Sequence, residues 1–421
     1  MNAGVRLIER FRDSAVYRSI FRAPVGDSPR RRTEASFSNV FLHIYPARVP
    51  RSLLRFSSTY RLGFISAVLF AILLITGVYL MFFYTPAVTM AHGDMQELRR
   101  TVGFGQLMRN VHRWSAHLMV LAVVLHLVRT FLDGAYKAPR EFNWVIGVLL
   151  LAVTLAYSFT GYLLPWDQVS YWAVRVASDL LHYVPGVGGS LRDFVLGGTS
   201  IGQATLLRFY VLHVAVLTGA FLGLLAVHLW RVRKDGFALA PWRGPAAAGE
   251  GERSGGAANV ERRSLGVVTV PPERVKPRAP ENEVFSWPHL MLRHQVVALA
   301  TIALCIALGI AFEAPLREMA NPNLTPEPAK APWYFVGFQE LLAHFDPVVA
   351  GVLAPAVLFI ALLILPYVDR NPHRHPRSRR LARYTFLLVV LSLVVLTVIG
   401  AFFRGPGWVF VLPWEHLYFE P

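Results

Sequence analysis

The sequence has 421 residues, of which 54% are hydrophobic, and its mean hydropathy is +0.42. This composition indicates a membrane protein, built either as one large unit or as two fused membrane modules. The net charge of +16 could suggest a nucleic-acid partner, but Lys and Arg gather in alternate connecting segments, with 28 in one set and 8 in the other. The positive-inside rule therefore places the N-terminus in the cytoplasm and the C-terminus outside, and no nucleic acid is expected as a partner.

Residues 1–60 form a basic segment ahead of the first apolar run. Apolar side chains stand among arginines near its start, which predicts an amphipathic helix on an anionic membrane surface. No apolar core precedes an Ala-x-Ala site, so a cleavable signal peptide is not expected. The lipid surface is therefore the expected partner of this segment.

Seven apolar runs follow, and each is long enough to cross about 30 Å of hydrocarbon as a helix. They lie at residues 61–84, 112–132, 143–164, 206–231, 290–313, 348–368 and 383–403. The expected fold class is an all-α integral membrane protein with about seven transmembrane helices.

A shift in composition divides the seven runs into two modules. Residues 235–284 are rich in Gly, Ala, Pro, Arg and Glu, which predicts a cytoplasmic linker. A four-helix module is expected over residues 61–234 and a three-helix module over 285–403. Residues 404–421 are then a tail on the outer face.

Two of the runs in the first module each carry a pair of histidines. His112 and His126 are fourteen residues apart, which puts them on one helix face, and His213 and His228 are fifteen apart, about 60° out of register. Ionisable groups inside a membrane are costly and point to a function. Two facing helices with histidines at matching depths predict a four-helix dihaem bundle with two bis-imidazole sites. Cys305 is the single cysteine, so attachment of haem through Cys-x-x-Cys-His is excluded.

Glycines in the other two helices of this module repeat the same period. Gly63 and Gly77 are fourteen residues apart, and so are Gly147 and Gly161. Glycine in a membrane helix ordinarily allows close helix packing. Two pairs with the period of the histidines favour a second interpretation, in which missing side chains make room for two flat macrocycles.

Two outer segments carry aromatic and acidic side chains. The segment after the third run contains Tyr162, Pro165 and Trp166, either as an aromatic belt or beside a lipid-soluble ring substrate. The segment between the fifth and sixth runs contains Trp333, Tyr334 and Glu340, and the three prolines within residues 326–344 predict an outer-face lid. Its carboxylate could accept the protons that a quinol releases on oxidation.

Three motifs resemble cytochrome b of the bc1 and b6f complexes. Residues 109–116 read Arg-Asn-Val-His-Arg-Trp-Ser-Ala, residues 161–168 read Gly-Tyr-Leu-Leu-Pro-Trp-Asp-Gln, and residues 208–213 read Arg-Phe-Tyr-Val-Leu-His. These motifs, and the fifteen-residue spacing of the second histidine pair, are similar to the b6 type in particular. The second module resembles subunit IV of b6f, and the resemblance extends from about residue 40 to residue 403.

The resemblance implies two non-covalent b-type haems and a site for quinol. Iron of the outer haem would be held by His112 and His213, and iron of the inner haem by His126 and His228. Haem propionates would pair with Arg109, Arg113 and Arg129, although these arginines could also simply extend to the membrane surface. Side chains implied at the outer quinol site are those of Tyr162, Pro165, Trp166, Trp333 and Tyr334.

The same resemblance implies a reaction and its partners. Quinol would be oxidised at the outer site, with one electron passing to a Rieske iron–sulfur protein and the other crossing both haems to an inner quinone. The complex would be a dimeric, proton-translocating quinol–cytochrome c reductase. It would include a c-type cytochrome subunit and lie in a bacterial inner membrane.

Two positions depart from the family pattern. Pro332 stands where the family lid carries a glutamate in Pro-Glu-Trp-Tyr, so we expect Glu340 to replace it, with His344 or Asp346 as alternatives. Arg61 stands where the b6 type has a cysteine that holds an extra covalent haem. That third haem is therefore not expected here.

Two other functions compete with this interpretation. A cytochrome b that anchors a dehydrogenase or hydrogenase also holds haems between helices, but it needs only four or five spans. A transporter could use the histidines as a proton relay, and it would be expected to show inverted repeats and discontinuous helices.

Overall fold

The computed structural model describes residues 45–46, 48–235, 283–326, 330–371, 373–403 and 410. The predicted surface helix, the linker and nearly all of the outer tail lie outside the described residues. The chain divides into two compact units, Met1–Tyr60 with Phe237–Arg293 and Arg61–Gly236 with His294–Pro421.

The smaller unit contains a two-stranded antiparallel sheet. Strand β1 (Arg48–Pro50) pairs with β2 (Glu283–Phe285), and Val49 lies opposite Val284. A 3₁₀ turn at Arg51–Leu54 follows β1. Three fully buried apolar side chains form the core of this unit: Val49, Leu53 and Leu290.

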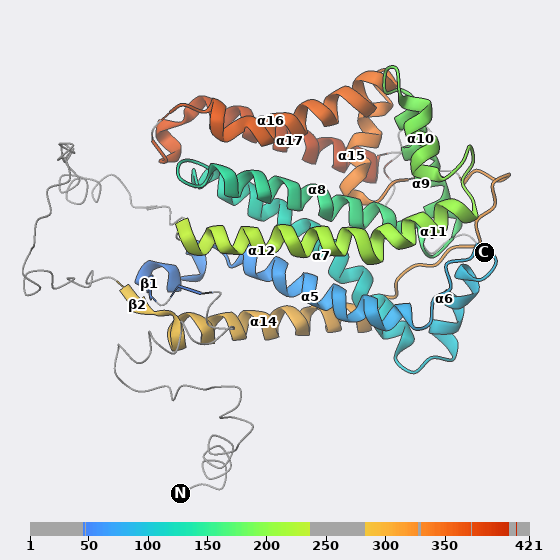
Figure 1. The fold of residues 1–421 in the computed structure, drawn as a ribbon, viewed down its shortest axis with the longest axis horizontal. Helices are drawn as coiled ribbons and strands as arrows, with labels where there is room; N and C mark the ends of the chain where they lie inside the picture. The colour runs from blue at the N-terminus through green and yellow to red at the C-terminus, as the bar shows by residue number, and fades with distance from the viewer. Residues whose placement is uncertain are drawn as a thin grey trace, which may run out of the picture. The chain divides into compact units, whose positions relative to one another are not determined.

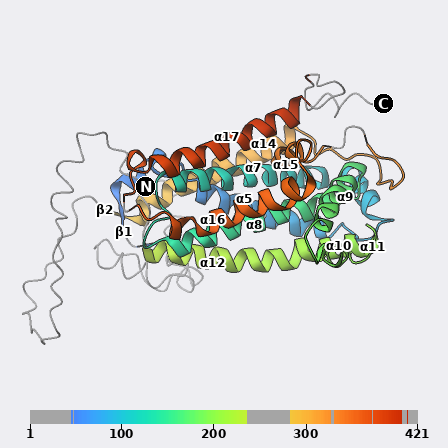
Figure 2. The ribbon, with the colours of Figure 1, turned by 90° about the horizontal axis from the view of Figure 1, so that it is seen from above.

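The larger unit is built from long apolar helices that run side by side (Figures 1 and 2). Its membrane-length helices are α5 (Leu62–Met81), α7 (Gly105–Leu132), α8 (Glu141–Leu163), the span Gln203–Asp235, α14 (Ser286–Ala311), the span Val348–Val368 and α17 (Arg380–Phe402). The fourth span joins α11 (Gln203–Val211), a π-helical turn (Leu212–Val216) and α12 (Leu217–Asp235), and the sixth joins a π-helical turn (Val348–Leu353) to α16 (Ala354–Val368). Seven helices in the described residues are therefore long and apolar enough to cross a membrane, which confirms the predicted fold class.

The predicted start of the second span is wrong by seven residues, because α7 begins at Gly105 and not at residue 112. Its first two turns are polar, so the apolar pattern does not include them. Asn110 donates to the Gly309 carbonyl at 2.8 Å and accepts from the Ala314 amide at 2.8 Å. Because α14 supplies these partners, the polar turns can be buried as helix.

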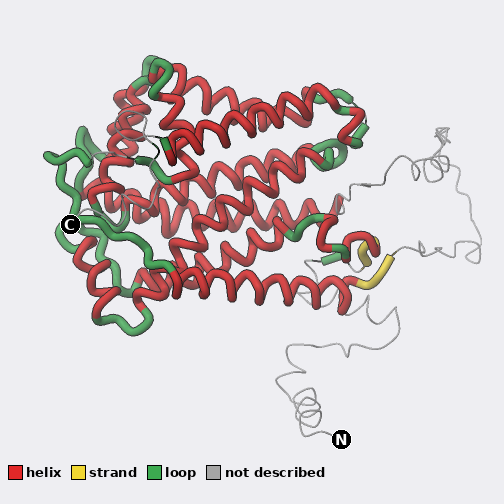
Figure 3. The backbone as a smooth tube through the Cα atoms, turned by 180° about the vertical axis from the view of Figure 1, so that it is seen from behind, coloured by secondary structure: helices red, strands yellow, loops and turns green. Residues whose placement is uncertain are grey.

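Four short helices gather at one end of the long helices (Figure 1). They are α6 (Ala91–Arg100), α9 (Gln168–His182), α10 (Gly188–Leu196) and α15 (Trp333–Leu342). Following the predicted topology, we call this the outer end and the opposite one the inner end. Figure 3 shows that the loops of the helical bundle lie at these ends.

At the outer end, the loop before α9 binds the segment after α14. The Asp167 side chain caps α9 by accepting from the Ser170 amide at 2.9 Å. The Gln168 amide donates to the Glu318 carbonyl at 2.9 Å, and the Gln168 side chain accepts from the Asn321 amide at 2.6 Å. Asp167 and Gln168 of the Pro-Trp-Asp-Gln motif therefore join the two predicted modules.

At the inner end, four polar side chains join the turn after α7 to the turn after α16. Asp369 forms an ion pair with Lys137 at 2.9 Å and accepts a hydrogen bond from the Tyr136 hydroxyl. Arg379 is only 3% exposed and donates to the Tyr136 oxygen at 2.9 Å and to the Leu132 carbonyl at 2.8 Å. Burial alone would raise the pKa of Asp369, but hydrogen bonds from Tyr136 and Lys137 hold that pKa below its ordinary value. This group is therefore a charged inner joint between the modules.

Candidate functional site

The four histidines of the first module meet in two pairs between α7 and the fourth span. His112 and His213 face each other with ring centroids 6.4 Å apart, and His126 and His228 do so at 6.5 Å. Metal–imidazole bonds of about 2 Å on either side of one ion, with the half-width of each ring, fill a separation of this size. Each pair can therefore hold one metal ion between two imidazoles.

The predicted offset of about 60° between His213 and His228 around their helix does not separate the two rings. His213 lies inside the π-helical turn Leu212–Val216, and a π turn accommodates one extra residue in an α-helix. The fifteen-residue spacing to His228 thus acts as a fourteen-residue spacing, and both rings face α7. The π turn was not predictable from the sequence spacing, because that estimate assumed 3.6 residues per turn along the whole helix.

Each of the four glycines faces one histidine ring. A methyl group built on Gly161 would lie 2.5 Å from Cε1 of His213, and one on Gly63 would lie 3.1 Å from Cε1 of His126. The corresponding distances are 3.3 Å from Gly77 to His112 and 3.6 Å from Gly147 to His228. Helices α5 and α8 therefore carry no side chain at the points where the four imidazoles approach them.

Threonines define the tautomer of the outer pair. The Thr76 hydroxyl donates to the Ile72 carbonyl at 2.7 Å, so it accepts from Nδ1–H of His112, 2.9 Å away. Thr160 donates to the Ala156 carbonyl at 2.9 Å and accepts from Nδ1–H of His213 at 3.2 Å. Both rings then keep the Nε2 lone pair for a metal, the arrangement that oriented metal-binding histidines use.

The inner pair has no such support. Nδ1 of His126 is buried and makes no hydrogen bond to any described residue, whereas the Asn143 backbone approaches the His228 ring and no side chain supports it. An apolar cluster that includes Met119, Ala122 and Phe221 separates the two pairs, and Met119 and Phe221 also line the cavity beside the outer pair. The two pairs therefore share spacing and glycine clearance but differ in their polar surroundings.

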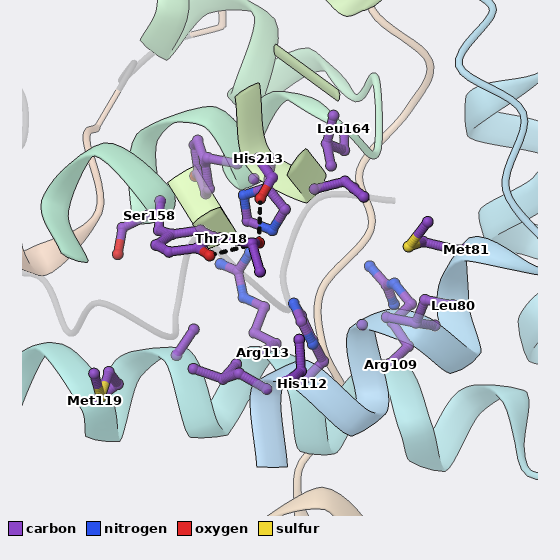
Figure 4. Close-up of a pocket in the computed structure, with 18 of the residues that line it drawn as sticks. Leu80, Met81, Arg109, His112, Arg113, Met119, Ser158, Leu164, His213 and Thr218 are labelled. Carbon is purple, nitrogen blue, oxygen red and sulfur yellow. Dashed lines mark hydrogen bonds between the residues drawn. The ribbon is translucent and has the colours of Figure 1, made fainter. Parts of the chain in front are cut away.

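A cavity of about 260 Å³ opens beside the outer pair. Figure 4 shows His112, Arg113 and Arg109 on the α7 side of this cavity, with His213 facing them. Gly77 and Gly161 also line it. The cavity is thus bounded by both imidazoles, both glycines and two cations.

The three arginines of the expected propionate sites have different partners. Arg109 donates to the Ala314 and Pro315 carbonyls, each at 2.7 Å, and so holds the segment that follows α14. Arg113 lies over the Tyr162 ring, 5.4 Å from its centroid, and lines the outer cavity. Arg129 forms an ion pair with Asp133 near the inner pair. Two of the three therefore stand beside a histidine pair with a guanidinium facing into the bundle, and Arg109 also lines the cavity.

A second cavity of about 1770 Å³ lies between α7, α8, α9 and the helices of the second module. Its lining includes Trp333 of α15, and three residues line both cavities: Ser158, Tyr162 and Tyr334. Burial raises the pKa of Tyr334, although the Arg113 guanidinium and a hydrogen bond with Ser158 oppose this shift. The Tyr334 hydroxyl is therefore protonated at neutral pH where the cavities meet.

Of the other predicted site residues, one lines a cavity and two are buried behind the lining. Pro165 lines the outer cavity, whereas Trp166 is 6% exposed and packs in the cluster with Tyr171. Glu340 is fully buried, 2.9 Å from Nε2 of His344, and does not line either cavity. Its Cβ instead approaches Gly400 of α17.

Sequence reasoning missed His117. This residue follows His112 by five positions on α7, lines the outer cavity and accepts a hydrogen bond from Trp333 of the lid at 3.0 Å. The available signal was a fifth histidine inside the apolar runs of the first module. It was overlooked because it has no partner at the fourteen-residue period.

Both halves of the chain match known families. Residues 49–236 match the model for cytochrome b/b6/petB, and residues 319–419 match that for cytochrome b(C-terminal)/b6/petD. Cytochrome b6 of Acaryochloris marina is 45% identical over 177 residues, which cover 42% of this chain and 82% of that protein. This chain belongs to the cytochrome b/b6 family. Cytochrome b6 of a Synechocystis species is 46% identical over 177 residues, which cover 42% of this chain and 80% of that protein.

A solved structure agrees with this assignment over most of the chain. A chain titled "Hyperthermophilic respiratory Complex III" superposes with a TM-score of 0.67 and 27% identity, covering 83% of this cytochrome b and 85% of that chain. The chain described here is therefore a multi-pass membrane cytochrome b with a b6-like part and a subunit IV-like part, in an oxidoreductase complex of the bc/b6f type.

Membership of the cytochrome b family implies haem, and the residues present fit that group. In the described part of the chain, no cluster of three or more metal-ligating side chains occurs, so the histidine pairs are the candidate iron ligands. A bis-imidazole site needs two ligands and a flat space beside them. Each pair offers both, because a glycine faces every ring.

Proposed function

We propose that this chain is the cytochrome b subunit of a proton-translocating quinol–cytochrome c reductase with two b-type haems. The observation that carries the proposal is the pair of facing histidine rings at each of two depths, 6.4 Å and 6.5 Å apart. His112 and His213 would hold the outer iron, and His126 and His228 the inner iron. When bound, such haems supply one-electron transfer across the membrane.

The protein's own residues would orient and shield this chemistry. Thr76 and Thr160 fix the outer imidazoles, and the glycines of α5 and α8 leave room for the macrocycles. Arg113 and Arg129 would neutralise propionates near the outer and inner pairs. Arg109 is proposed for the same role from its place in the cavity wall, while two of its donors also bind carbonyls of the segment after α14.

Quinol would bind where the two cavities meet. Tyr162, Trp333 and Tyr334 offer aromatic faces and hydroxyl groups there, which suits a ring substrate that carries an apolar tail. One electron would pass to a Rieske iron–sulfur protein, which in turn serves a c-type cytochrome. The other would cross both haem sites to quinone at the inner end. We place this dimeric complex in a bacterial inner membrane, with the N-terminus in the cytoplasm.

Glu340 is the proposed proton acceptor of the lid, in place of the missing glutamate at Pro332. Its carboxylate is buried, and His344, 2.9 Å away and half-exposed, would pass the proton outward. Because Glu340 lies behind the lining residues, a proton has to travel through the lid to reach it.

The proposal is tested by a dithionite-reduced minus oxidised spectrum of the purified protein, with acid-extractable haem measured per chain. We expect two b haems, and one after either His112→Ala or His126→Ala. His92→Ala is the control, because His92 lies on α6 and bonds to the Arg317 carbonyl. A protein without haem, or with haem indifferent to both substitutions, would refute the proposal and favour the proton-relay alternative.

A further inference from the structure

His117 connects the first module directly to the lid. The indole N–H of Trp333, the first residue of α15, donates to Nδ1 of His117 at 3.0 Å. The His117 ring also lies 5.9 Å from the Tyr334 ring and 5.5 Å from the Trp114 ring. Trp114 is fixed in turn, since its indole N–H donates to the Phe312 carbonyl at 2.8 Å. His117 is thus held in an aromatic frame with the lid on one side.

The direction of this hydrogen bond determines the charge of His117. An indole nitrogen can only donate, so Nδ1 of His117 has to present a lone pair. An imidazolium has protons on both nitrogens and no lone pair to offer. The bond to Trp333 therefore exists only while Nδ1 is unprotonated, and the neutral ring carries its proton on Nε2.

The groups around His117 leave few alternative proton acceptors. Arg113 lies one turn before it on α7, Tyr334 faces it from α15, and Tyr162 lies under Arg113 on α8. The described residues that line the outer cavity include no Asp or Glu, and His112 and His213 are the facing pair. Histidine is the side chain whose ordinary titration lies closest to neutral pH. Burial and the nearby Arg113 guanidinium favour the neutral ring of His117, so the bond to Trp333 forms at neutral pH and is lost only when a proton is delivered to this ring.

We propose that His117 is a positioning residue that holds the lid through Trp333 and releases it when Nδ1 takes up a proton. The inference rests on the proposed function, in which quinol gives up two electrons to the two acceptors and two protons into this region. One of those protons on Nδ1 of His117 removes the acceptor for the Trp333 N–H. Lid position is then coupled to proton release, so the oxidised ring leaves from a loosened site.

The test is amide hydrogen exchange of the peptide Trp333–Leu342 in the haem-loaded full-length protein, from pH 8 to pH 3, corrected for intrinsic exchange. In the unsubstituted protein we expect protection to fall by about fivefold as pH decreases, the loss of one hydrogen bond. Trp333→Phe keeps an aromatic ring without the donor, so protection should be low at every pH. His117→Gln keeps an acceptor that does not titrate, so protection should be high at every pH.

His92→Gln is the control, because His92 also bonds to the second module at the outer end and should leave the pH dependence unchanged. Protection that still varies with pH in His117→Gln, or that is unaltered in Trp333→Phe, would overturn the proposal. Quinol oxidation by the same samples distinguishes failure of the His117 proposal from failure of the proposed function. Normal turnover with a lid insensitive to pH rejects only the role of His117, whereas a pH-sensitive lid without turnover rejects only the proposed function.

Discussion

The outer and inner histidine pairs use one geometry in two environments. Their ring separations differ by only 0.1 Å, from 6.4 Å to 6.5 Å. The outer rings bond to Thr76 and Thr160 and border a cavity, whereas no side chain among the described residues bonds to Nδ1 of either inner ring. Hydrogen bonds and solvent access around ligands tune the reduction potential of a bound metal. One repeated framework can thus give two haems of different potential.

The largest expected effect comes from adding a methyl group at the glycine that lies closest to a histidine ring. In Gly161→Ala the new methyl group would lie 2.5 Å from the His213 ring, so that ring has to move away from His112. In Gly147→Ala the distance is 3.6 Å, an ordinary contact. We expect haem extracted per chain to fall from two to one in the first variant and to stay at two in the second. Equal haem content in both variants would contradict the clearance argument.

The next effect concerns chemistry at the outer end alone. Glu340→Gln should lower quinol oxidation by at least tenfold, because a positioned proton acceptor contributes about 10²–10⁴-fold, while both haems are retained. Glu313→Gln, at an exposed carboxylate paired with Arg99, is the control. Steady-state turnover with haem content measured on the same sample decides the matter. Unchanged turnover would remove Glu340 from the mechanism and direct the same test to Asp346.

A third prediction compares a buried ion pair at the inner end with an exposed one at the outer end. Because the pKa of Asp369 is lowered in the folded protein, its carboxylate stabilises the fold above its ordinary pKa, and this stabilisation is lost as pH falls through the lowered value. Asp369→Asn should therefore cost about 1–3 kcal/mol at pH 7, and the difference should shrink below about pH 4.

Thermal unfolding followed by circular dichroism at pH 7 and at several pH values below the ordinary pKa of an aspartate, about 3.9, would measure this difference. Glu313→Gln is the control, because Glu313 pairs with Arg99 while their side chains are 47% and 60% exposed. Exposed pairs contribute about 0–1 kcal/mol. Equal losses in the two variants would mean that the inner joint adds nothing beyond a surface pair.

The smallest expected effect concerns the difference in reduction potential between the outer and inner haems. Replacing Thr76 and Thr160 by valine removes the acceptors of both outer Nδ1–H groups, so the imidazoles become weaker electron donors. We expect the midpoint potential of the outer haem to rise by about 40 mV, which corresponds to about 1 kcal/mol for one electron. Thr130→Val is the control, because its hydroxyl bonds to the His126 carbonyl and not to a ring. A redox titration in which both haems shift equally would argue against this assignment.

What the sequence could predict depended on local periodicity. The seven spans, the histidine spacing and the glycine spacing all follow from residues within one helix, and the fold class and family were confirmed. The module boundaries, the haem-ligand roles and the role of Glu340 stay predictions. The π turn at His213, the carbonyl partners of Arg109 and the bond between His117 and Trp333 were not predictable. Each depends on which helix packs against which, and a single sequence does not contain that information.

The two joints between the modules also bear on how such a protein can be encoded. Gln168 at the outer end and Arg379 at the inner end reach across the boundary with hydrogen bonds of their own. Neither joint uses residues 236–282, so these contacts would form equally well between two separate polypeptides. A gene broken within that segment would encode partners that recognise each other at both membrane surfaces. The match to cytochrome b6 of Acaryochloris marina covers 82% of that protein but 42% of this chain.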